Sequence, residues 1–228
     1  IELNPFLEAF GNAKTCRNNN SSRFGKFIKL QFNHGGNVAG ASLESYLLEK
    51  SRIVSQAGGE RNYHIFYQLI AGATPDEKKR YHLRGCEQFN FLNKSGCYSV
   101  ERMNDVKEFE HTKNAMQTCD IGAEFQENIF KVISAILWLG NFPFVAGGSG
   151  DGAALSGTEE RDIAAELLSV DPKKLEDALI KPCIIAGRDR VQTHLNPQQA
   201  SDSRDALVKA LYGRLFLWLV NRANEVLS

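Results

Sequence analysis

The sequence of 228 residues has no surplus of either charge, because 27 Lys and Arg balance 27 Asp and Glu. A formal net charge of zero gives no bulk electrostatic reason to expect binding to nucleic acid or to an anionic membrane. The longest strictly apolar runs, such as residues 215–220, are far shorter than the roughly 20 residues of a membrane-spanning helix. The N-terminus also lacks the basic and then apolar pattern of a signal peptide. We therefore expect a soluble, cytoplasmic protein without a nucleic-acid or membrane partner.

Paired cysteines are absent as well. The five cysteines are scattered, odd in number and never spaced as Cys-x-x-Cys: Cys16, Cys86, Cys97, Cys119 and Cys183. This spacing indicates neither a disulfide framework nor a zinc site, so we expect reduced thiols. The sequence also contains no Gly-x-x-x-x-Gly-Lys-Ser/Thr, the signature of a P-loop that cradles phosphates. The glycine-rich run at 146–152 lacks that ending, and its composition is typical of a flexible surface loop.

The length and the 43% hydrophobic content allow a substantial core in one or two domains. The chain begins at Ile1 rather than Met and enters directly into Asn-Pro-Phe-Leu-Glu-Ala-Phe, so we expect a fragment of a longer protein.

Ten residues near the start, RNNNSSRFGK at 17–26, crowd amides, hydroxyls and cations before a strand-like segment. Three consecutive asparagines disfavour regular structure because their amides compete for backbone hydrogen bonds. The same amides and hydroxyls can bind phosphate oxygens, and a serine hydroxyl is a ligand that magnesium accepts. Arg23 adds a planar cation that can clamp a carboxylate. These residues therefore fit a phosphate and magnesium site, although a solvated basic turn fits them too.

The rest of the pattern is mainly helical. Residues 27–32 alternate apolar and polar, a His-Gly-Gly-Asn turn follows, and residues 38–48 supply a second strand candidate, which predicts an antiparallel hairpin. The last predicted helix is amphipathic, with Leu207, Leu211, Leu215, Trp218 and Leu219 at three- and four-residue spacings, and residues 215–220 are apolar all round, so we expect them to be buried. The apolar period and the capping residues predict helices at 60–73, from Pro75, and at 105–118, 126–139, 158–168, 171–180 and 197–227.

His64 invites a catalytic or metal-binding interpretation. No second histidine stands at ligand spacing, however, and the surrounding helix is apolar. We expect a packed, hydrogen-bonded histidine without a chemical role.

Residues 4–26, NPFLEAFGNAKTCRNNNSSRFGK, resemble the switch I region of the myosin motor domain almost residue for residue. Kinesin motors carry a related Asn-x-x-Ser-Ser-Arg, but they continue with Ser-His where this chain has Phe-Gly-Lys. One departure is Cys16, where myosins usually place threonine or valine. The resemblance spans the whole chain and is nearest in wording to conventional class II myosins, with further matches in YLLEKSR at 46–52, ERNYHIFYQL at 60–69 and DALVKALYGRLF at 205–216.

This resemblance implies a partial α/β P-loop NTPase motor fold. The expected architecture is a mainly α-helical upper subdomain with two antiparallel strands of the central transducer sheet. The chain would be one partial motor domain, 1–228, with the end of a helix and switch I at 1–26, transducer strands at 27–54, upper-subdomain helices, loop 4 and the cardiomyopathy loop at 55–196, and a long helix leading toward switch II at 197–228.

The resemblance also implies a site for ATP and Mg²⁺. Ser22 matches the serine that ligates magnesium, and Ser21 matches the one beside the γ-phosphate and the attacking water. Asn18 matches a phosphate-contacting asparagine, and Lys26 lies in the same motif. Arg23 matches the arginine that pairs with a switch II glutamate when the site closes. Ser21 and Arg23 are therefore the expected catalytic residues.

A second site is implied at 183–193, which resembles the cardiomyopathy loop, an actin-contacting element of myosin heads. Asp189 stands where the family carries either an acidic residue or a phosphorylatable one, so regulation by phosphorylation is not expected there. The implied protein is an actin-based motor of the actomyosin cytoskeleton, with actin, the rest of the heavy chain and light chains bound elsewhere as partners. The expected actin-binding residues are Gly187, Arg188, Asp189 and Arg190.

Two alternatives remain open. The chain has no P-loop and ends before the Asp-x-x-Gly-Phe-Glu of switch II, so we expect it to be inactive alone. A non-catalytic helical interaction module derived from the motor fold would look similar, and the presence of a P-loop and switch II in the flanking sequence would distinguish the two. A nucleic-acid binder is suggested by aromatic side chains among the cations of residues 14–27, but the zero net charge opposes it.

Overall fold

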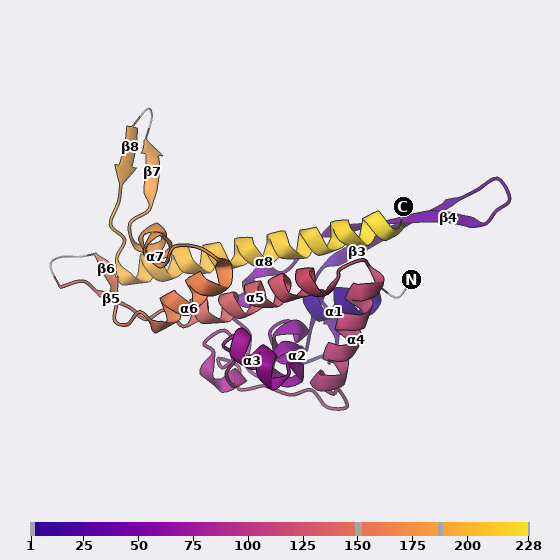
Figure 1. Ribbon diagram of the computed structural model, residues 1–228, viewed down its shortest axis with the longest axis horizontal. Helices are drawn as coiled ribbons and strands as arrows, with labels where there is room; N and C mark the ends of the chain where they lie inside the picture. Colours follow the sequence, from indigo (N-terminus) through magenta and orange to yellow (C-terminus); the bar gives the residue numbers. More distant parts are fainter. Residues whose placement is uncertain (1–2, 149–151, 187–188, 228) are drawn as a thin grey trace.

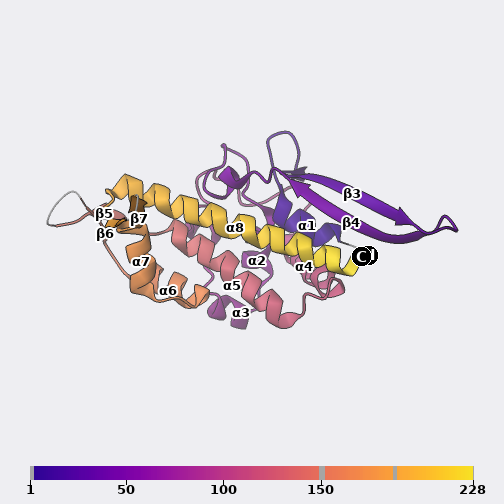
Figure 2. The same ribbon diagram turned by 90° about the horizontal axis from the view of Figure 1, so that it is seen from above.

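Two long helices, α5 (Ala123–Gly140) and α8 (Pro197–Leu227), run along the longest dimension of the molecule and pack against each other (Figures 1 and 2). This computed structural model describes residues 3–148, 152–186 and 189–227. Hairpins project at both ends of this helix pair. The hairpin of β7 (Cys183–Ala186) and β8 (Asp189–Gln192) lies near the start of α8, and that of β3 (Gly25–Phe32) and β4 (Val38–Tyr46) lies near its end.

The remaining elements surround this axis. Beneath it in Figure 1 lie α2 (His64–Gly72), α3 (Pro75–Arg80) and α4 (Asp105–Thr118), and α1 (Asn4–Gly11) packs on α4 and α2. The described part of the chain is mostly helical, with antiparallel two-stranded sheets. The other elements are β1 (Asn12–Ala13), β2 (Ser21–Ser22), the 3₁₀ turns Lys50–Ile53 and Cys86–Gln88, β5 (Phe144–Ala146), β6 (Ala153–Leu155), α6 (Glu159–Leu168) and α7 (Pro172–Ile180).

An aromatic cluster in the core fixes α1, α2 and α8 relative to one another. The ring of Tyr212 on α8 stacks on Tyr63 and Phe66, with centroids 5.0 and 5.6 Å apart. The Tyr212 hydroxyl donates to the carbonyl of Phe10, at 2.8 Å. All four side chains are fully buried. Because Phe10 lies near the end of α1, this cluster sets where the chain emerges into the residues that follow α1.

The β3–β4 hairpin confirms the antiparallel pair that the two-residue period predicts, with Ile28 opposite Leu43. Its base is fastened to α8, because the Asn224 side chain bonds both the N–H and the carbonyl of Leu43. Beyond that anchor both strands extend away from the helices (Figure 2). Large apolar side chains are exposed along the hairpin on both sides of the anchor: Phe27, Ile28, Leu30, Phe32, Val38 and Tyr46.

The predicted helix at 60–73 is wrong at its start, since α2 begins at His64. The Asn62 amide group donates to the carbonyls of Ile53 and Phe91, so the chain before the helix is held by contacts outside it. The other helices lie where the sequence predicts them. A capping box of Thr74 and Glu77 starts α3, and the Asp171 carboxylate caps α7.

As far as residue 216, the buried face of α8 is displaced by one residue from the predicted apolar face, whereas Leu219 is buried as predicted. Leu207, Leu211 and Leu215 are only half-buried, and Leu217 is 53% exposed. With 3.6 residues per turn, a run of six cannot keep every side chain on a face that is covered from one side. The buried positions of α8 are Ala200, Arg204, Val208, Tyr212, Phe216, Leu219, Val220 and Ala223.

No helix in the described part of the chain combines the length and apolarity needed to cross a membrane.

Candidate functional site

The predicted phosphate site lies on a loop whose two ends are brought together. We call residues 14–23 the switch loop. Ser21 and Ser22 form the short strand β2, which pairs antiparallel with β1. The N–H of Arg23 also donates to the carbonyl of Gly11, at 2.8 Å. The intervening residues 16–20 are exposed, so the switch loop presents its polar side chains to solvent.

The asparagines use their polar groups locally, as their composition predicts. Asn18 and Thr15 exchange hydrogen bonds, from the Thr15 N–H to the Asn18 carbonyl (2.8 Å) and from the Asn18 N–H to Thr15 Oγ1 (3.1 Å). The Asn18 side-chain oxygen accepts from the N–H of Asn20, at 2.8 Å. Asn18 is thus held in a turn by its own backbone and oxygen, while its side chain remains exposed.

The two serines have different hydrogen-bonding roles. Ser21 Oγ accepts from Arg23 Nη2 at 2.7 Å, so its own proton is available to a further acceptor. Ser22 Oγ instead donates to the carbonyl of Phe24 at 2.9 Å, so its lone pairs are available. One serine can therefore donate to a phosphate or hold a water, and its neighbour can coordinate a cation.

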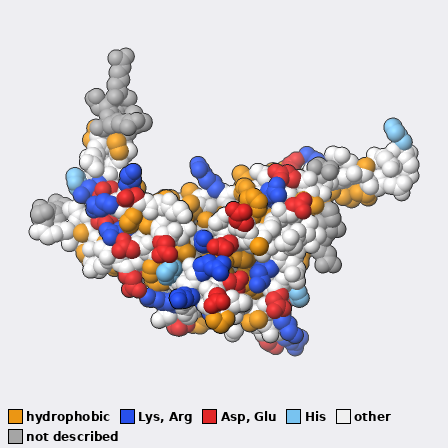
Figure 3. Space-filling model, in the orientation of Figure 1, with side chains coloured by type: hydrophobic (Ala, Val, Ile, Leu, Met, Phe, Trp, Pro, Cys, Tyr) orange, Lys and Arg blue, Asp and Glu red, His pale blue; other side chains and the backbone are white. Residues whose placement is uncertain are grey.

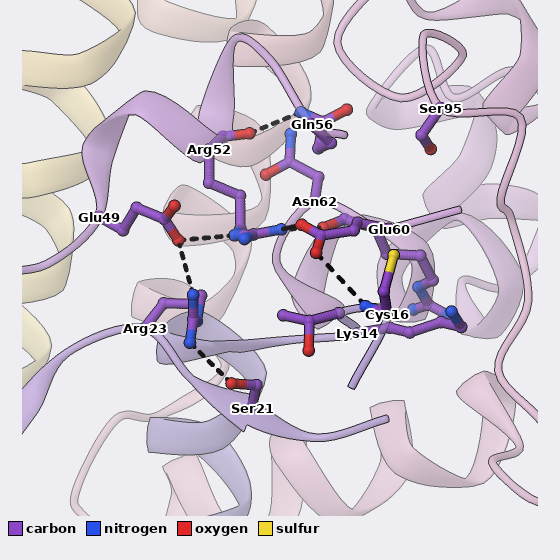
Figure 4. Close-up of polar contacts among 12 residues, drawn as sticks. Lys14, Cys16, Ser21, Arg23, Glu49, Arg52, Gln56, Glu60, Asn62 and Ser95 are labelled. Carbon is purple, nitrogen blue, oxygen red and sulfur yellow. Dashed lines mark hydrogen bonds and ion pairs between the residues drawn. The ribbon is translucent and has the colours of Figure 1, made fainter. Parts of the chain in front are cut away.

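Arg23 lies at one end of a chain of charged side chains (Figure 4). Its Nη1 is 3.4 Å from Glu49 Oε2, and the same oxygen accepts from Arg52 Nε at 2.8 Å. Arg52 Nη1 continues to Glu60 Oε2 at 2.9 Å. The other oxygen of Glu60 accepts from the N–H of Cys16, at 3.3 Å. This ionic chain, Arg23–Glu49–Arg52–Glu60, therefore touches the switch loop near both of its ends.

Arg52 and Glu60, at the end of the ionic chain away from Arg23, remain charged. Burial would lower the pKa of Arg52, but its hydrogen bonds with Glu49 and Glu60 outweigh burial and raise it. Burial would raise the pKa of Glu60, but the Arg52 hydrogen bond and the Cys16 N–H hold it below its ordinary value. The Arg52 side chain is only 6% exposed, whereas those of Arg23 and Glu49 are 28% and 37% exposed. The ionic chain is thus buried at Arg52 and partly exposed at Arg23 and Glu49.

Asn20 fastens the other side of the switch loop. Its Nδ2 donates to Glu8 Oε2 at 2.8 Å, and its Oδ1 accepts from Asn12 Nδ2 at 3.0 Å. His64 Nε2 lies 3.1 Å from the same Oδ1, so this nitrogen must be the protonated one. Glu8, Asn20 and His64 also line a polar cavity of about 230 Å³.

His64 is the packed, hydrogen-bonded histidine that the sequence predicts, because it is 2% exposed and bonded to Asn20. Burial, aided by the charge of Arg61, lowers its pKa to about 3. The imidazole is therefore neutral near pH 7. Its position at the start of α2 makes it a support for the switch loop.

The buried His64 is expected to make the stability of this chain fall as the pH drops below about 6.5. The unfolded chain binds a proton near that pH, whereas the folded chain does not until about pH 3. The free energy of unfolding should therefore fall by about 2 kcal/mol between pH 6.5 and 5 from this residue. Urea unfolding at both pH values measures it, and the His64→Gln variant should lose that part of the pH dependence.

The control for this prediction is His111→Gln, because the His111 side chain is 61% exposed. That variant should keep the pH dependence of the original chain. An unchanged slope in His64→Gln would contradict the assignment of a neutral, buried imidazole.

The remaining predicted residues lie elsewhere. Lys26 is on β3, and its Nζ donates to Asn4 Oδ1 on α1 at 3.2 Å, so its contact is not with the serines. Asp189 and Arg190 form the start of β8, and their backbones pair with Ala186 and Ile185. Gly187 and Arg188 lie outside the described residues. The structure therefore brings Ser21, Ser22 and Arg23 together and places the predicted actin-binding hairpin far from them, at the start of α8 (Figure 1).

The sequence model of the myosin head (motor domain) matches residues 1–228. The chain belongs to this family. It is 52% identical over its whole length to a myosin-2 heavy chain, non muscle, of Acanthamoeba castellanii, and covers 15% of that protein. It is 47% identical over 99% of its length to myosin-17 of Arabidopsis thaliana, again covering 15%. A myosin-I heavy chain of Dictyostelium discoideum is 50% identical over 96% of the chain, which covers 10% of it.

The contacts of several residues of this myosin head with the switch loop could not be predicted from the sequence. Glu49, Glu60 and His64 are 26, 44 and 44 positions away from their partners in the switch loop. Glu49 falls in the YLLEKSR match, and Glu60 and His64 fall in the ERNYHIFYQL match. These sequence matches are the signal that the three residues are important, but a sequence match does not show which residues they contact. In the described part of the chain, no three His, Cys, Asp or Glu side chains form a metal-binding group.

Proposed function

We propose that this chain is the switch I and upper-subdomain part of a class II type, actin-based motor. The motor would couple Mg-ATP hydrolysis to force and movement along actin filaments. The observation that carries the proposal is the pair of serines in a myosin head sequence, with one free proton and one free set of lone pairs side by side. The rest of the heavy chain, actin and light chains bound elsewhere would be its partners in the cytoplasmic actomyosin cytoskeleton.

The donors of the switch loop fit magnesium and ATP. Magnesium prefers oxygen ligands and is held by few protein groups together with phosphate oxygens, so the Ser22 hydroxyl suits it. When bound, the ion would offset the negative charge of the phosphates. Ser21 would donate its proton to the γ-phosphate or the attacking water, and the exposed Asn18 amide would bind a phosphate oxygen. Arg23 would hold Ser21 in position and pair with the switch II carboxylate, with Lys26 at the edge of the site.

The proposed fold is part of a P-loop NTPase motor. The exposed apolar residues of the β3–β4 hairpin support this proposal, because a two-stranded hairpin is at most marginally stable and gains stability as part of a larger sheet. Residues 1–26, 27–54, 55–196 and 197–228 would then be switch I, the transducer strands, the upper subdomain and the helix toward switch II.

The β7–β8 hairpin is the proposed actin contact, through Gly187, Arg188, Asp189 and Arg190. Its projection from the body supports this role (Figure 1), because a protruding hairpin can reach a filament without moving the core. The carboxylate of Asp189 would supply a permanent negative charge there.

A non-catalytic helical interaction module remains the alternative, since the 228 residues contain neither a P-loop nor switch II. Binding to nucleic acid has little support, because Figure 3 shows basic and acidic side chains interspersed over the face in view.

The complete motor domain that contains this chain is expected to hydrolyse ATP, and actin filaments should accelerate that turnover. The 228-residue chain alone is expected to show no turnover, because the P-loop and switch II groups that hold the phosphates are not in it. Phosphate release from both proteins, measured with and without actin filaments, tests the proposal. A complete motor domain without ATP turnover would favour the interaction module, and turnover by the isolated chain would contradict the assignment of the site.

A further inference from the structure

Among the residues that the structure describes, Glu49 is the one charged acceptor of the Arg23 guanidinium. Arg23 also donates through Nη2 to Ser21 Oγ and through Nε to the carbonyl of Ser22, at 2.7 and 3.1 Å. The contact with Glu49 Oε2, at 3.4 Å, is the longest of the three. Glu49 therefore attracts the Arg23 side chain by charge while leaving it bonded to the switch loop.

Glu49 does not depend on Arg23 for its own neutralisation. The same oxygen that faces Arg23 accepts a shorter hydrogen bond from Arg52, at 2.8 Å. Arg52 is buried and is fixed in turn by Glu60 and by the carbonyl of Arg61. If the Arg23 guanidinium moved away, the Glu49 carboxylate would keep a cation in place. Such a departure leaves no unpaired buried charge, which is what usually makes the loss of an ion pair unfavourable.

The backbone of Arg23 is held by two hydrogen bonds, whereas its side chain is partly exposed to solvent. The Arg23 N–H donates to Gly11, and the Arg23 carbonyl accepts from the N–H of Glu49 at 2.9 Å. These two bonds anchor the residue between the end of α1 and the segment that carries Glu49. A rotation of the Arg23 side chain, which is 28% exposed, could therefore change the partners of its guanidinium without moving its backbone.

We propose that Glu49 is the resting partner of Arg23 and a positioning residue for the nucleotide site. It holds the guanidinium against Ser21 until Arg23 exchanges Glu49 for a second carboxylate, and that exchange closes the site. The inference depends on the proposed function, which supplies the second carboxylate from switch II. One cation moves between two carboxylates, so no covalent bond changes and no proton is transferred. The second carboxylate therefore competes with Glu49 for Arg23, and the negative charge of Glu49 opposes closure.

The Glu49→Gln variant of the complete motor domain tests this competition. Glutamine keeps the size of the side chain and an acceptor for Arg52, but it removes the charge that retains Arg23. We expect closure to become easier, so the ratio of bound hydrolysis products to bound ATP should rise about two- to fivefold, in the range of a partly exposed ion pair. Rapid acid quench of a single turnover measures this ratio. The matched control is Glu127→Gln, whose carboxylate also bridges two cations, Arg80 and Lys131, and its ratio should not change.

The Glu49→Asp variant provides a second test if Glu49→Gln unfolds at a lower temperature. Aspartate keeps the charge but is one methylene shorter, so it should lose the longer contact with Arg23 before the contact with Arg52. A smaller rise in the same ratio is expected. An unchanged or lower ratio in the variant that folds normally would overturn the proposal. The absence of ATP hydrolysis by the original motor domain would instead overturn the proposed function.

Discussion

Replacing Ser21 and Ser22 together by alanine should reduce the ATP turnover of the complete motor domain by at least about 100-fold. ATP hydrolysis depends mainly on positioning and on electrostatic stabilisation of charge on the transferred phosphoryl group. Ser21 has a free proton because its oxygen accepts from Arg23, and Ser22 has free lone pairs because its proton is used by Phe24. Alanine at both positions removes the donor and the cation ligand at once. Steady-state phosphate release at saturating ATP measures the effect.

The single variants should separate the two roles. Ser22→Ala is expected to need more magnesium for the same turnover, because it removes a ligand of the ion. Ser21→Ala should lower the turnover number without that shift, because it removes a donor that acts on the phosphate or the water.

Ser201→Ala is the matched control for the loss of a hydroxyl. Ser201 Oγ also accepts from an arginine, since Arg204 Nη2 lies 2.7 Å away on α8. It belongs to α8 and not to the switch loop, so its removal should leave turnover close to that of the original protein. A double alanine variant that hydrolyses ATP at the original rate would end the interpretation of this loop as a nucleotide switch.

The local parts of this molecule are the parts that the sequence predicts well. The hairpin, the cap of α7 and the crowding of Ser21 and Ser22 beside Arg23 all depend on residues close together in the chain. The period of two along β3 follows from the alternation of side chains in a strand, and Pro172 can occupy only the first turn of its helix. Tertiary packing leaves these features in place.

The face of α8 could not be predicted, because two neighbouring rows of this helix are equally apolar. One row runs through Leu207, Leu211 and Leu215, and the other through Val208, Tyr212 and Phe216. Both have the four-residue spacing of a helix face. The second row is the buried one because Tyr212 stacks in the aromatic cluster and its hydroxyl reaches the Phe10 carbonyl. Contacts with α1 and α2, more than 100 residues away in sequence, therefore determine which row of α8 is buried.

The support of the switch loop was hidden for a similar reason. Glu49 and Glu60 are two of 27 acidic residues, and nothing in their neighbourhood marks them as partners of Arg23 or of Cys16. The segment between β4 and α2 carries both residues, and the fold packs this segment against the switch loop, so that Glu49 reaches Arg23 and Glu60 reaches Cys16. The motif thus identifies the groups that would touch a nucleotide, and the tertiary structure identifies the groups that hold them.

Asp105→Ala is expected to lower the free energy of unfolding of this chain by about 3 kcal/mol, the low end of what breaking a buried ion pair costs. Arg61 is fully buried, and its two terminal nitrogens each donate to one carboxylate oxygen of Asp105 at 2.9 Å. The guanidinium also lies 3.8 Å from the centre of the Tyr67 ring, so it cannot turn toward water without losing that contact. Alanine at position 105 therefore leaves a buried cation without its anion. Urea unfolding at pH 7 measures the loss.

Glu159→Ala offers a matched control for Asp105→Ala, because it removes the same kind of group in a solvent-exposed setting. Glu159 pairs with Arg84, and Arg84 lies over the ring of Trp138 just as Arg61 lies over Tyr67. Both acids occupy the first turn of a helix. Since the Arg84 and Glu159 side chains are 41% and 62% exposed, the loss should be below about 1 kcal/mol. Equal losses at the two sites would mean that burial of Arg61 does not determine the effect, whereas partial recovery in Arg61→Met with Asp105→Ala would show that the unpaired charge does.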